Sequence, residues 1–343
     1  MKQPLRALTN RLIDRIAHGY RGRVSDHFDG RRFHNARPLT HSAGDLLRWW
    51  RNRENHPWQR IEQFAPPPAP PQRVDDGLRI TWINHATVLI QAGGLNLLTD
   101  PIFSERASPL SWAGPRRYHP PGVAFDDLPP IDIVAISHAH YDHLDRASVA
   151  RLVARFDPHF VVPLGVDGYL ARFGAQRITC GDWWQDVELN DRLRLTITPA
   201  QHWSRRGLLD RNRSLWAGFW FDTPAGAVYF AGDTGMGPHF GTIRERLGAP
   251  RVALLPIGAY EPRWFMAPQH MNPADAVDAH QQLGAQQSVG IHFATFKLTD
   301  EGQAEPARAL ARARDAAGLN TDRFIVPTFG QALAIAPVAH KTG

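Results

Sequence analysis

Short apolar blocks separated by polar turns dominate the chain from residue 78 onward. The first block, LRITWINHATVLIQAGGLNLLTD (78–100), predicts two or more strands that turn at Gly93-Gly94. Similar blocks recur and predict further strands within residues 131–138, 160–165, 193–200, 227–233, 252–258, 288–294 and 324–330.

Three segments carry helical patterns instead. Residues 146–156 and 306–317 predict helices. A third helix is expected to start within MNPADAVDAHQQLG (271–284), where Asn272 can cap the first turn and Pro273 occupies the first helical position. Strands in sequential hairpins with interspersed helices indicate sheets covered by helices, an α/β (α+β) arrangement.

The N-terminal region has its own composition. Residues 1–60 carry 13 Lys or Arg against 5 Asp or Glu, whereas the net charge of the whole chain is +6. The proline-rich stretch APPPAPPQ (65–72) predicts a stiff, extended connector. We therefore expect a basic arm over residues 1–64, a connector over 65–74 and a body over 75–343.

The start of the arm predicts a partly amphipathic helix. Apolar residues recur there at helical spacing, at Leu5, Leu8, Leu12, Ile13 and Ile16. With arginines between them, such a helix either contacts the surface of a membrane or packs on the rest of the protein.

Composition narrows the class and the location. A hydrophobic fraction of 43% and a charged fraction of 21% are typical of globular proteins, and no apolar run approaches the ~20 residues of a membrane-spanning helix. The N-terminus lacks the continuous apolar stretch of a secretory signal. The single cysteine, Cys180, excludes an internal disulfide and is more typical of a packed thiol than of a nucleophile. We expect a cytoplasmic protein, with peripheral contact at the inner face of a membrane through the basic arm.

The densest chemistry lies in SHAHYDHLD (137–145), directly after the apolar IDIVAI segment. Alternation along an extended chain places His138 and His140 on one side, and Asp142 and His143 follow as the chain turns. Imidazole nitrogens and carboxylate oxygens are ligands for zinc and similar divalent ions. Such groups are costly to bury without a partner, so this pattern predicts a metal site.

Four ligands do not complete two metal sites, and further candidates follow later strands. They are His202 in TITPAQHW, Asp233 in VYFAGDTG and His292 in SVGIHFATF. A strand followed by His or Asp and then a turn is where α/β-type proteins place functional groups.

These motifs resemble the metallo-β-lactamase superfamily, and within it the N-acylphosphatidylethanolamine-hydrolysing phospholipase D family. The resemblance rests on TWINHATVLIQ, LLTDPIFSERASP, GPRRYHPPG, LPPIDIVAISHAHYDHLD, PAQHWSRR, FAGDTG, PIGAYEPRWFMAPQHMNPADAV and IHFATF. It spans residues 75–330 and implies that 75–343 is a catalytic domain folded as a four-layer αβ/βα sandwich. The superfamily as a whole does not share the GAYEPRWFM stretch, which is the most discriminating part of the match.

The resemblance also implies a ligand set. One metal would be held by His138, His140 and His202, and the second by Asp142, His143 and His292, with Asp233 bridging the two. The family metal is zinc, so two Zn²⁺ are expected, although this set of nitrogen and oxygen ligands also suits iron or manganese.

Two metals in such a site can present a hydroxide to a phosphodiester phosphorus. The resemblance implies a phospholipase D whose products are N-acylethanolamine and phosphatidic acid. We expect Asp142, Asp233 and His270 to take part in catalysis, with His270 helping to protonate the leaving oxygen or, alternatively, serving as a capping or packing residue. Asp100 is either a carboxylate that orients a ligand histidine or the cap of the following turn. His280 reads as a helical surface residue without a chemical role.

A lipid substrate also needs an apolar groove. The GAYEPRWFM segment supplies candidate lining residues, which core packing would equally explain: Tyr260, Arg263, Trp264, Phe265 and Met266. The arginine-rich SRRGLLDRNR (204–213) could attract lipid phosphates.

Other functions remain open on the same residues. A phosphodiesterase or lactonase acting on a nucleotide or another small substrate would use the same dimetal core, and a non-catalytic lipid-binding relative is a further alternative. The chain contains no recognisable RNA-binding module, so nucleic acid is not an expected partner. A phospholipid substrate is expected, and a homodimer is an open alternative to a monomer.

Overall fold

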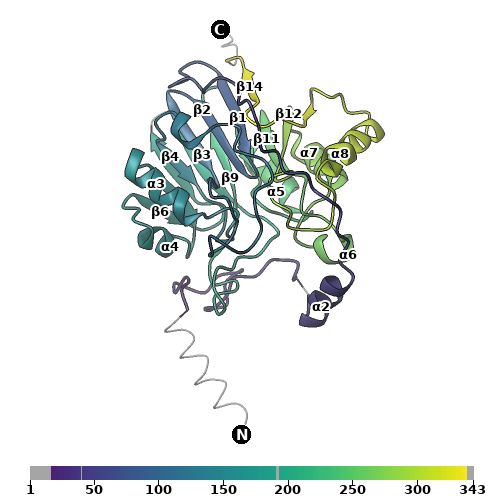
Figure 1. The fold of residues 1–343 in the computed structure, drawn as a ribbon. Coiled ribbons are helices and arrows are strands. Elements are labelled where there is room, and N and C mark those ends of the chain that lie inside the picture. The colour runs from purple at the N-terminus through teal and green to yellow at the C-terminus, as the bar shows by residue number, and fades with distance from the viewer. Residues whose placement is uncertain (1–16, 40, 191–192, 338–343) are drawn as a thin grey trace.

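The computed structural model describes residues 17–39, 41–190 and 193–337. In this part of the chain the strands form two seven-stranded sheets (Figure 1). The first sheet has the order β14-β1-β2-β3-β4-β5-β6 and contains β1 (Leu78–Asn84), β2 (Thr87–Ala92), β3 (Leu95–Thr99), β4 (Ile133–Ala135), β5 (His159–Pro163), β6 (Ile178–Gly181) and β14 (Ala332–Ile335). The second has the order β13-β12-β11-β10-β9-β8-β7 and contains β7 (Asp186–Asn190), β8 (Leu193–Thr198), β9 (Gly218–Asp222), β10 (Val228–Phe230), β11 (Val252–Pro256), β12 (Gln287–Ile291) and β13 (Phe324–Ile325).

The two sheets share one pairing pattern. Strands β1, β2 and β3 form an antiparallel meander, and β3 to β6 continue in parallel. In the second sheet β7 to β10 are antiparallel, and β10 to β13 are parallel. Because parallel strands require crossover connections, helices lie between the parallel strands of each half and cover its outer face.

Helices cover the outer face of each sheet. The described helices are α2 (Ala43–Arg51), α3 (Arg146–Phe156), α4 (Asp167–Arg172), α5 (His239–Leu247), α6 (Arg263–Met266), α7 (Pro273–Leu283) and α8 (Glu305–Ala316), with a 3₁₀ turn at Phe125–Asp127. Figure 1 shows α2 apart from both sheets, at the lower right of the view. Leu152 of α3 and Leu170 of α4 pack on the first sheet, and Ile243 of α5 and Val277 of α7 pack on the second. The four-layer αβ/βα sandwich expected from the sequence is therefore confirmed.

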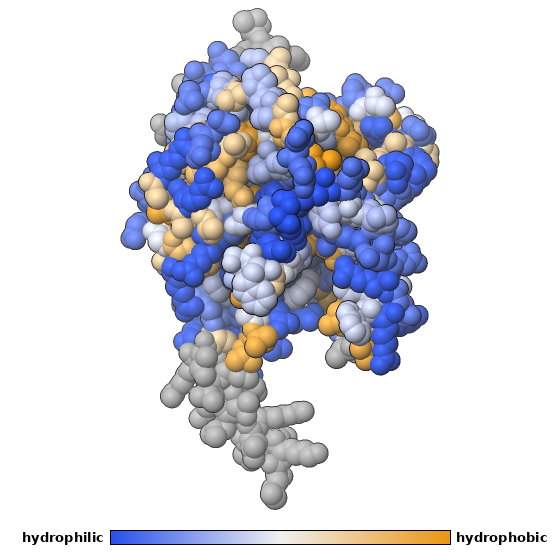
Figure 2. Space-filling view, viewed as in Figure 1, coloured by the Kyte–Doolittle hydropathy of each residue, from blue (hydrophilic) through white to orange (hydrophobic). Residues whose placement is uncertain are grey.

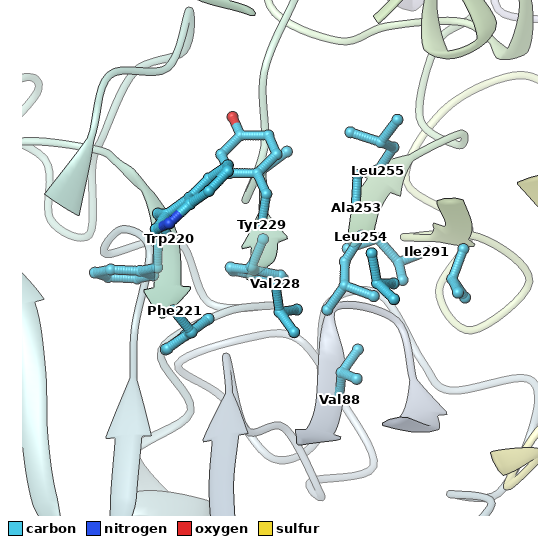
Figure 3. Packing of buried hydrophobic residues seen from close by; sticks show 14 of the residues in the cluster. Val88, Trp220, Phe221, Val228, Tyr229, Ala253, Leu254, Leu255 and Ile291 are labelled. Carbon is cyan, nitrogen blue, oxygen red and sulfur yellow. The ribbon is translucent and has the colours of Figure 1, made fainter. Parts of the chain in front are cut away.

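The main core lies between the two sheets. Figure 3 shows Val88 of β2 directed toward Val228 of β10 and Leu254 of β11, and all three side chains are fully buried. Burying a valine or leucine side chain contributes about 1.5–3 kcal/mol, so this interface fixes the sheets face to face.

Most predicted elements form where the sequence places them. Helix α3 has the expected bounds, and α8 begins and ends one residue earlier than predicted. Helix α7 begins after Asn272, whose side chain accepts a hydrogen bond from the Asp275 backbone as expected of a cap. The sequence patterns did not predict β6, β7, β9, β14, α2, α4, α5 or α6.

The described part of the N-terminal arm packs on the body. Phe28 and Phe33 are buried against Leu215 and Trp216, and the carbonyl of Pro71 in the connector accepts a hydrogen bond from Gln91. The amphipathic helix predicted near the start of the arm lies outside the described residues. Among the helices that are described, none has the length and apolar character needed to span a bilayer.

Two expectations about single residues are wrong. His280 is 3% exposed rather than on the surface, and its Nδ1 lies 2.8 Å from the Ser288 hydroxyl because α7 turns this face toward β12. Cys180 is exposed rather than packed, because β6 is the edge strand of the first sheet.

Candidate metal centre

All seven residues expected to bind metal meet at one edge of the sandwich. His138, His140, Asp142 and His143 follow β4, His202 follows β8, Asp233 follows β10, and His292 follows β12. These buried strands deliver polar side chains to the edge where their carboxyl ends meet. The two sheets therefore contribute donors to the same point.

Three imidazole nitrogens face one another in the first group. His138 Nε2 lies 2.7 Å from His140 Nδ1, and His202 Nε2 lies 3.4 Å from the same atom. Burial lowers the pKa of His138 well below its usual value, and lowers those of His140 and His202 to about 3 and about 4. These rings are thus neutral near pH 7 and offer lone pairs.

Asp233 occupies the centre of the cluster. Its Oδ2 lies 3.2 Å from His143 Nε2, 3.7 Å from His202 Nε2 and 4.0 Å from His138 Nε2. Its Oδ1 lies 3.1 Å from His292 Nε2. Its carboxylate therefore contacts residues of both expected triads.

The second group surrounds Asp142. Its Oδ2 lies 3.4 Å from His143 Nε2 and 3.6 Å from His292 Nε2. Burial on its own lowers the pKa of His292, but the Asp233 and Asp142 carboxylates more than compensate and raise it to about 9. Burial on its own would also lower the pKa of His143, but these carboxylates outweigh it and raise the pKa well above its usual value.

A further set of groups orients the histidines of the cluster. Asp100 Oδ2 lies 2.7 Å from His143 Nδ1 and also accepts a hydrogen bond from the Ser137 hydroxyl. Ser137 Oγ in turn lies 2.9 Å from His138 Nδ1. The backbone carbonyl of Gln269 lies 2.9 Å from His202 Nδ1. Contacts of this kind fix the tautomer and orientation of a metal-binding imidazole.

His85 belongs to the cluster although none of the sequence motifs predicted a role for it. His85 lies in the turn between β1 and β2, is 1% exposed, and places Nε2 3.0 Å from Asp142 Oδ2. The available signal was a histidine at the point where the first predicted hairpin turns. His85, Asp100 and His292 have φ values of 42°, 34° and 63°, a left-handed region that costs about 1–3 kcal/mol for a non-glycine residue. Strained backbone thus concentrates at this site.

The donors fit a pair of divalent cations. In the first group, nitrogen atoms of three neutral, buried imidazoles face one another. No single N–H among them can donate a hydrogen bond to all of the others. His270 Nδ1 is also buried and has no hydrogen-bond partner. A cation would remove the cost of these facing nitrogen lone pairs.

The cluster lies at the bottom of a cavity of about 550 Å³. His140, Asp142, Asp233 and His270 line its polar part. Its apolar part is lined by Leu46, Ala107, Phe265, Met266 and Leu298. A second cavity, of about 630 Å³, lies beside Tyr260 and contains no residue of the cluster.

Only some of the groove residues expected from GAYEPRWFM line the cavity beside the cluster. Phe265 and Met266 line the cavity beside the cluster, whereas Tyr260 lines the second cavity. Trp264 lines a separate surface hollow, and Arg263 is bound to the Asp275 carboxylate at 2.6 Å. Tyr260 precedes α6, and consecutive side chains within α6 diverge by about 100° each, so this segment cannot direct all of them to one cavity.

Comparisons with known proteins agree with this geometry. The fold and the buried His/Asp cluster define a member of the beta-lactamase superfamily, and a family model described as "Beta-lactamase superfamily domain" matches residues 95–293. The N-acyl-phosphatidylethanolamine-hydrolyzing phospholipase D 1 of Caenorhabditis elegans is 38% identical over 270 residues, which cover 75% of this chain and 76% of the relative. The chain therefore belongs to the N-acyl-phosphatidylethanolamine-hydrolyzing phospholipase D family.

Two further comparisons support the assignment at different levels. The mitochondrial N-acyl-phosphatidylethanolamine-hydrolyzing phospholipase D of Saccharomyces cerevisiae is 34% identical over 73% of this chain and 54% of its own length. The crystal structure of an isothiocyanate hydrolase from Delia radicum gut bacteria matches with a TM-score of 0.61 at 24% identity, covering 75% of this chain and 99% of that one. The latter match supports the fold alone.

Proposed function

We propose that this protein is a dimetal phospholipase D that releases N-acylethanolamine and phosphatidic acid from N-acylphosphatidylethanolamine. The observation that carries the proposal is the convergence of two donor triads on Asp233 at the bottom of a cavity with an apolar wall. Membership of the family supports the substrate class. A peripheral position at the inner face of a membrane belongs to the same proposal.

The residues that would hold the metals are His138, His140 and His202 for one ion, and Asp142, His143 and His292 for the other. Asp233 would contact both. Zinc is the ion we propose, and iron or manganese would suit the same donors. When bound, such a pair supplies Lewis acidity, which lowers the pKa of water and neutralises charge on a phosphoryl group.

The protein's own side chains then position the reactants. Oxygen from water forms a new bond to phosphorus while the bond from phosphorus to the ethanolamine oxygen breaks, so phosphatidic acid and N-acylethanolamine leave. The departing oxygen takes up a proton. His270 lines the cavity, and its Nδ1 lies 4.0 Å from Asp233 Oδ2, so its ring is placed to donate a hydrogen bond to the departing oxygen.

The apolar wall fits a lipid. Phe265 and Met266 from α6 and Leu46 from α2 flank the polar bottom of the cavity. A chain that enters along this wall would bring its phosphodiester next to His270 and Asp233, and the volume is within the range of small-ligand sites.

Product analysis by mass spectrometry tests the proposal. Zinc-loaded protein is incubated with N-acylphosphatidylethanolamine in mixed micelles, in parallel with a chromogenic phosphodiester and a lactone. The His138→Ala variant removes a donor, and His159→Ala, at the opposite end of the sheet, is the matched control. We expect N-acylethanolamine and phosphatidic acid from the wild type and the control but not from His138→Ala. Hydrolysis of the chromogenic diester or the lactone alone would reject the lipid substrate, and inactivity on all three would reject a catalytic role.

A further inference from the structure

Helix α2 has one anchored face and one exposed face. On the anchored side, Trp49 Nε1 donates a hydrogen bond to Asp300 at 2.9 Å and its ring stacks on Phe265. Next to Trp49 on the helix surface, Leu46, Leu47 and Trp50 are 53%, 46% and 72% exposed. Large apolar side chains gathered on one side of a single helix are unfavourable in water, which indicates that this face docks against something.

A second exposed apolar tip belongs to the loop that follows His202. Leu208 is 87% exposed and Leu209 is 45% exposed. Trp203, Arg205 and Arg211 of this loop line the same cavity as Leu46 and Trp49. Figure 2 shows apolar surface on the α2 lobe and a separate apolar patch toward the lower edge of the body. The cavity thus opens between two segments that each carry exposed leucines.

Basic side chains accompany both segments. Within the described chain, Arg205 and Arg211 form no ion pair with a carboxylate; Arg205 donates to the Gly207 carbonyl, and the Arg211 guanidinium lies 4.7 Å from the Trp203 ring centre. Arg48 and Arg51 occupy the last turn of α2. Apolar tips flanked by guanidinium groups are complementary to acyl chains beneath a layer of anionic headgroups. A second copy of the same surface would bring like charges together.

We propose that the exposed leucines and Trp50 of α2, together with Leu208 and Leu209, insert into the interface of an anionic phospholipid bilayer, so that the cavity opens directly onto the membrane. The proposal rests on the proposed function, because a diacyl substrate resides in a bilayer. Leu46 belongs both to the exposed face and to the cavity wall. It would provide a continuous apolar path from the bilayer to the site.

Vesicle sedimentation tests this surface without any catalytic readout. The full-length protein is mixed with phosphatidylcholine vesicles that contain or lack phosphatidylglycerol. The variant is Leu47→Gln/Trp50→Gln, since neither residue lines the cavity. The matched control is Leu189→Gln, a partly exposed leucine on β7 near the opposite ends of the strands. Thermal melting of all three proteins verifies that they are folded.

We expect the wild type and Leu189→Gln to bind vesicles, more strongly with phosphatidylglycerol, and the double variant to bind at least about tenfold more weakly. Activity on a monomeric short-chain diester should stay unchanged in the double variant. Equal binding by the double variant would overturn the proposal, as would a wild type that ignores vesicles. If the wild type is a dimer, and the double substitution dissociates it while vesicle binding stays intact, the surface instead binds a second copy of the chain. The vesicles contain no N-acylphosphatidylethanolamine, so vesicle binding is measured independently of hydrolysis. Vesicle binding by a protein that forms no product in the mixed-micelle assay would reject the proposed function and leave the docking surface standing.

Discussion

His85 Nε2 lies 3.0 Å from Asp142 Oδ2, and both side chains belong to the cluster that we propose as the metal centre. The His85 ring also packs on that of His292, with ring centres 3.9 Å apart. A turn between the first two strands of one sheet therefore supports two proposed ligands of the second metal, one of which comes from the other sheet.

His85→Ala should weaken the second metal site by releasing the Asp142 carboxylate. Loss of such a contact typically reduces metal affinity or activity by about 10–100-fold. His85→Gln retains an N–H donor at a similar reach and should recover part of the loss. Metal content by plasma mass spectrometry after dialysis against a weak chelator measures the effect. Normal metal retention by His85→Ala would show that the contact is only structural.

Asp233→Asn should remove the carboxylate shared by both triads. We expect close to two divalent ions per chain in the wild type and at least one fewer in the variant, because two-metal sites depend on a bridging anion. The melting temperature of the wild type should fall on chelation, since a metal that binds only the folded state stabilises it. Asp126→Asn, at an exposed position, is the control. Equal metal content in both variants would argue against a bridging role.

His27 should stabilise the described arm more at low pH than at high pH. Its imidazole lies 2.7 Å from Asp182 Oδ1 and 2.6 Å from Asp26 Oδ1. Burial on its own would lower the pKa of His27, but these carboxylates outweigh it and raise the pKa. The stabilisation is then fully present below the ordinary histidine value and is lost as pH rises through the raised pKa. Urea unfolding of the wild type and His27→Gln should differ more at pH 6 than at pH 9; a constant difference would contradict this.

His239 should have the opposite pH dependence. Burial lowers its pKa to about 3, so at acidic pH the unfolded chain takes up a proton that the folded chain does not. Stability is therefore lost as pH falls below the ordinary histidine value, by on the order of 2 kcal/mol at pH 5. His239→Gln should lose less stability between pH 7 and pH 5 than the wild type in the same urea titration. Parallel curves for the two proteins would refute the assignment.

Met266→Ala should impair long-chain substrates selectively, because Met266 lines the cavity beside the cluster. Burial of a methionine side chain is worth about 1.5–3 kcal/mol, which predicts a loss in kcat/KM of roughly tenfold or more for long acyl chains. Short-chain substrates should be affected much less. Trp264→Ala changes a neighbouring residue that lines a different hollow and serves as the control. A similar loss for every chain length would point to a general defect in the site.

Local patterns account for the parts of the fold that the sequence predicted. Asn272 and Pro273 mark the start of α7, and Gly93-Gly94 mark the turn between β2 and β3, because capping and turn formation depend on adjacent residues. The short strand β9 was not recognised, because GFWFD is buried on both faces and shows no alternation.

The H-x-H-x-D-H segment and the strand-end residues His202, Asp233 and His292 could be proposed as metal ligands from the sequence alone, because imidazole and carboxylate groups are costly to bury without a cation and therefore stand out after apolar strands. Tertiary structure decided which side chains reach them. It brought His85 to Asp142, turned Tyr260 and Trp264 away from the cavity, and exposed the apolar face of α2 at its mouth. Contacts between segments more than fifty residues apart depend on how whole sheets and helices pack, and no local pattern records that packing.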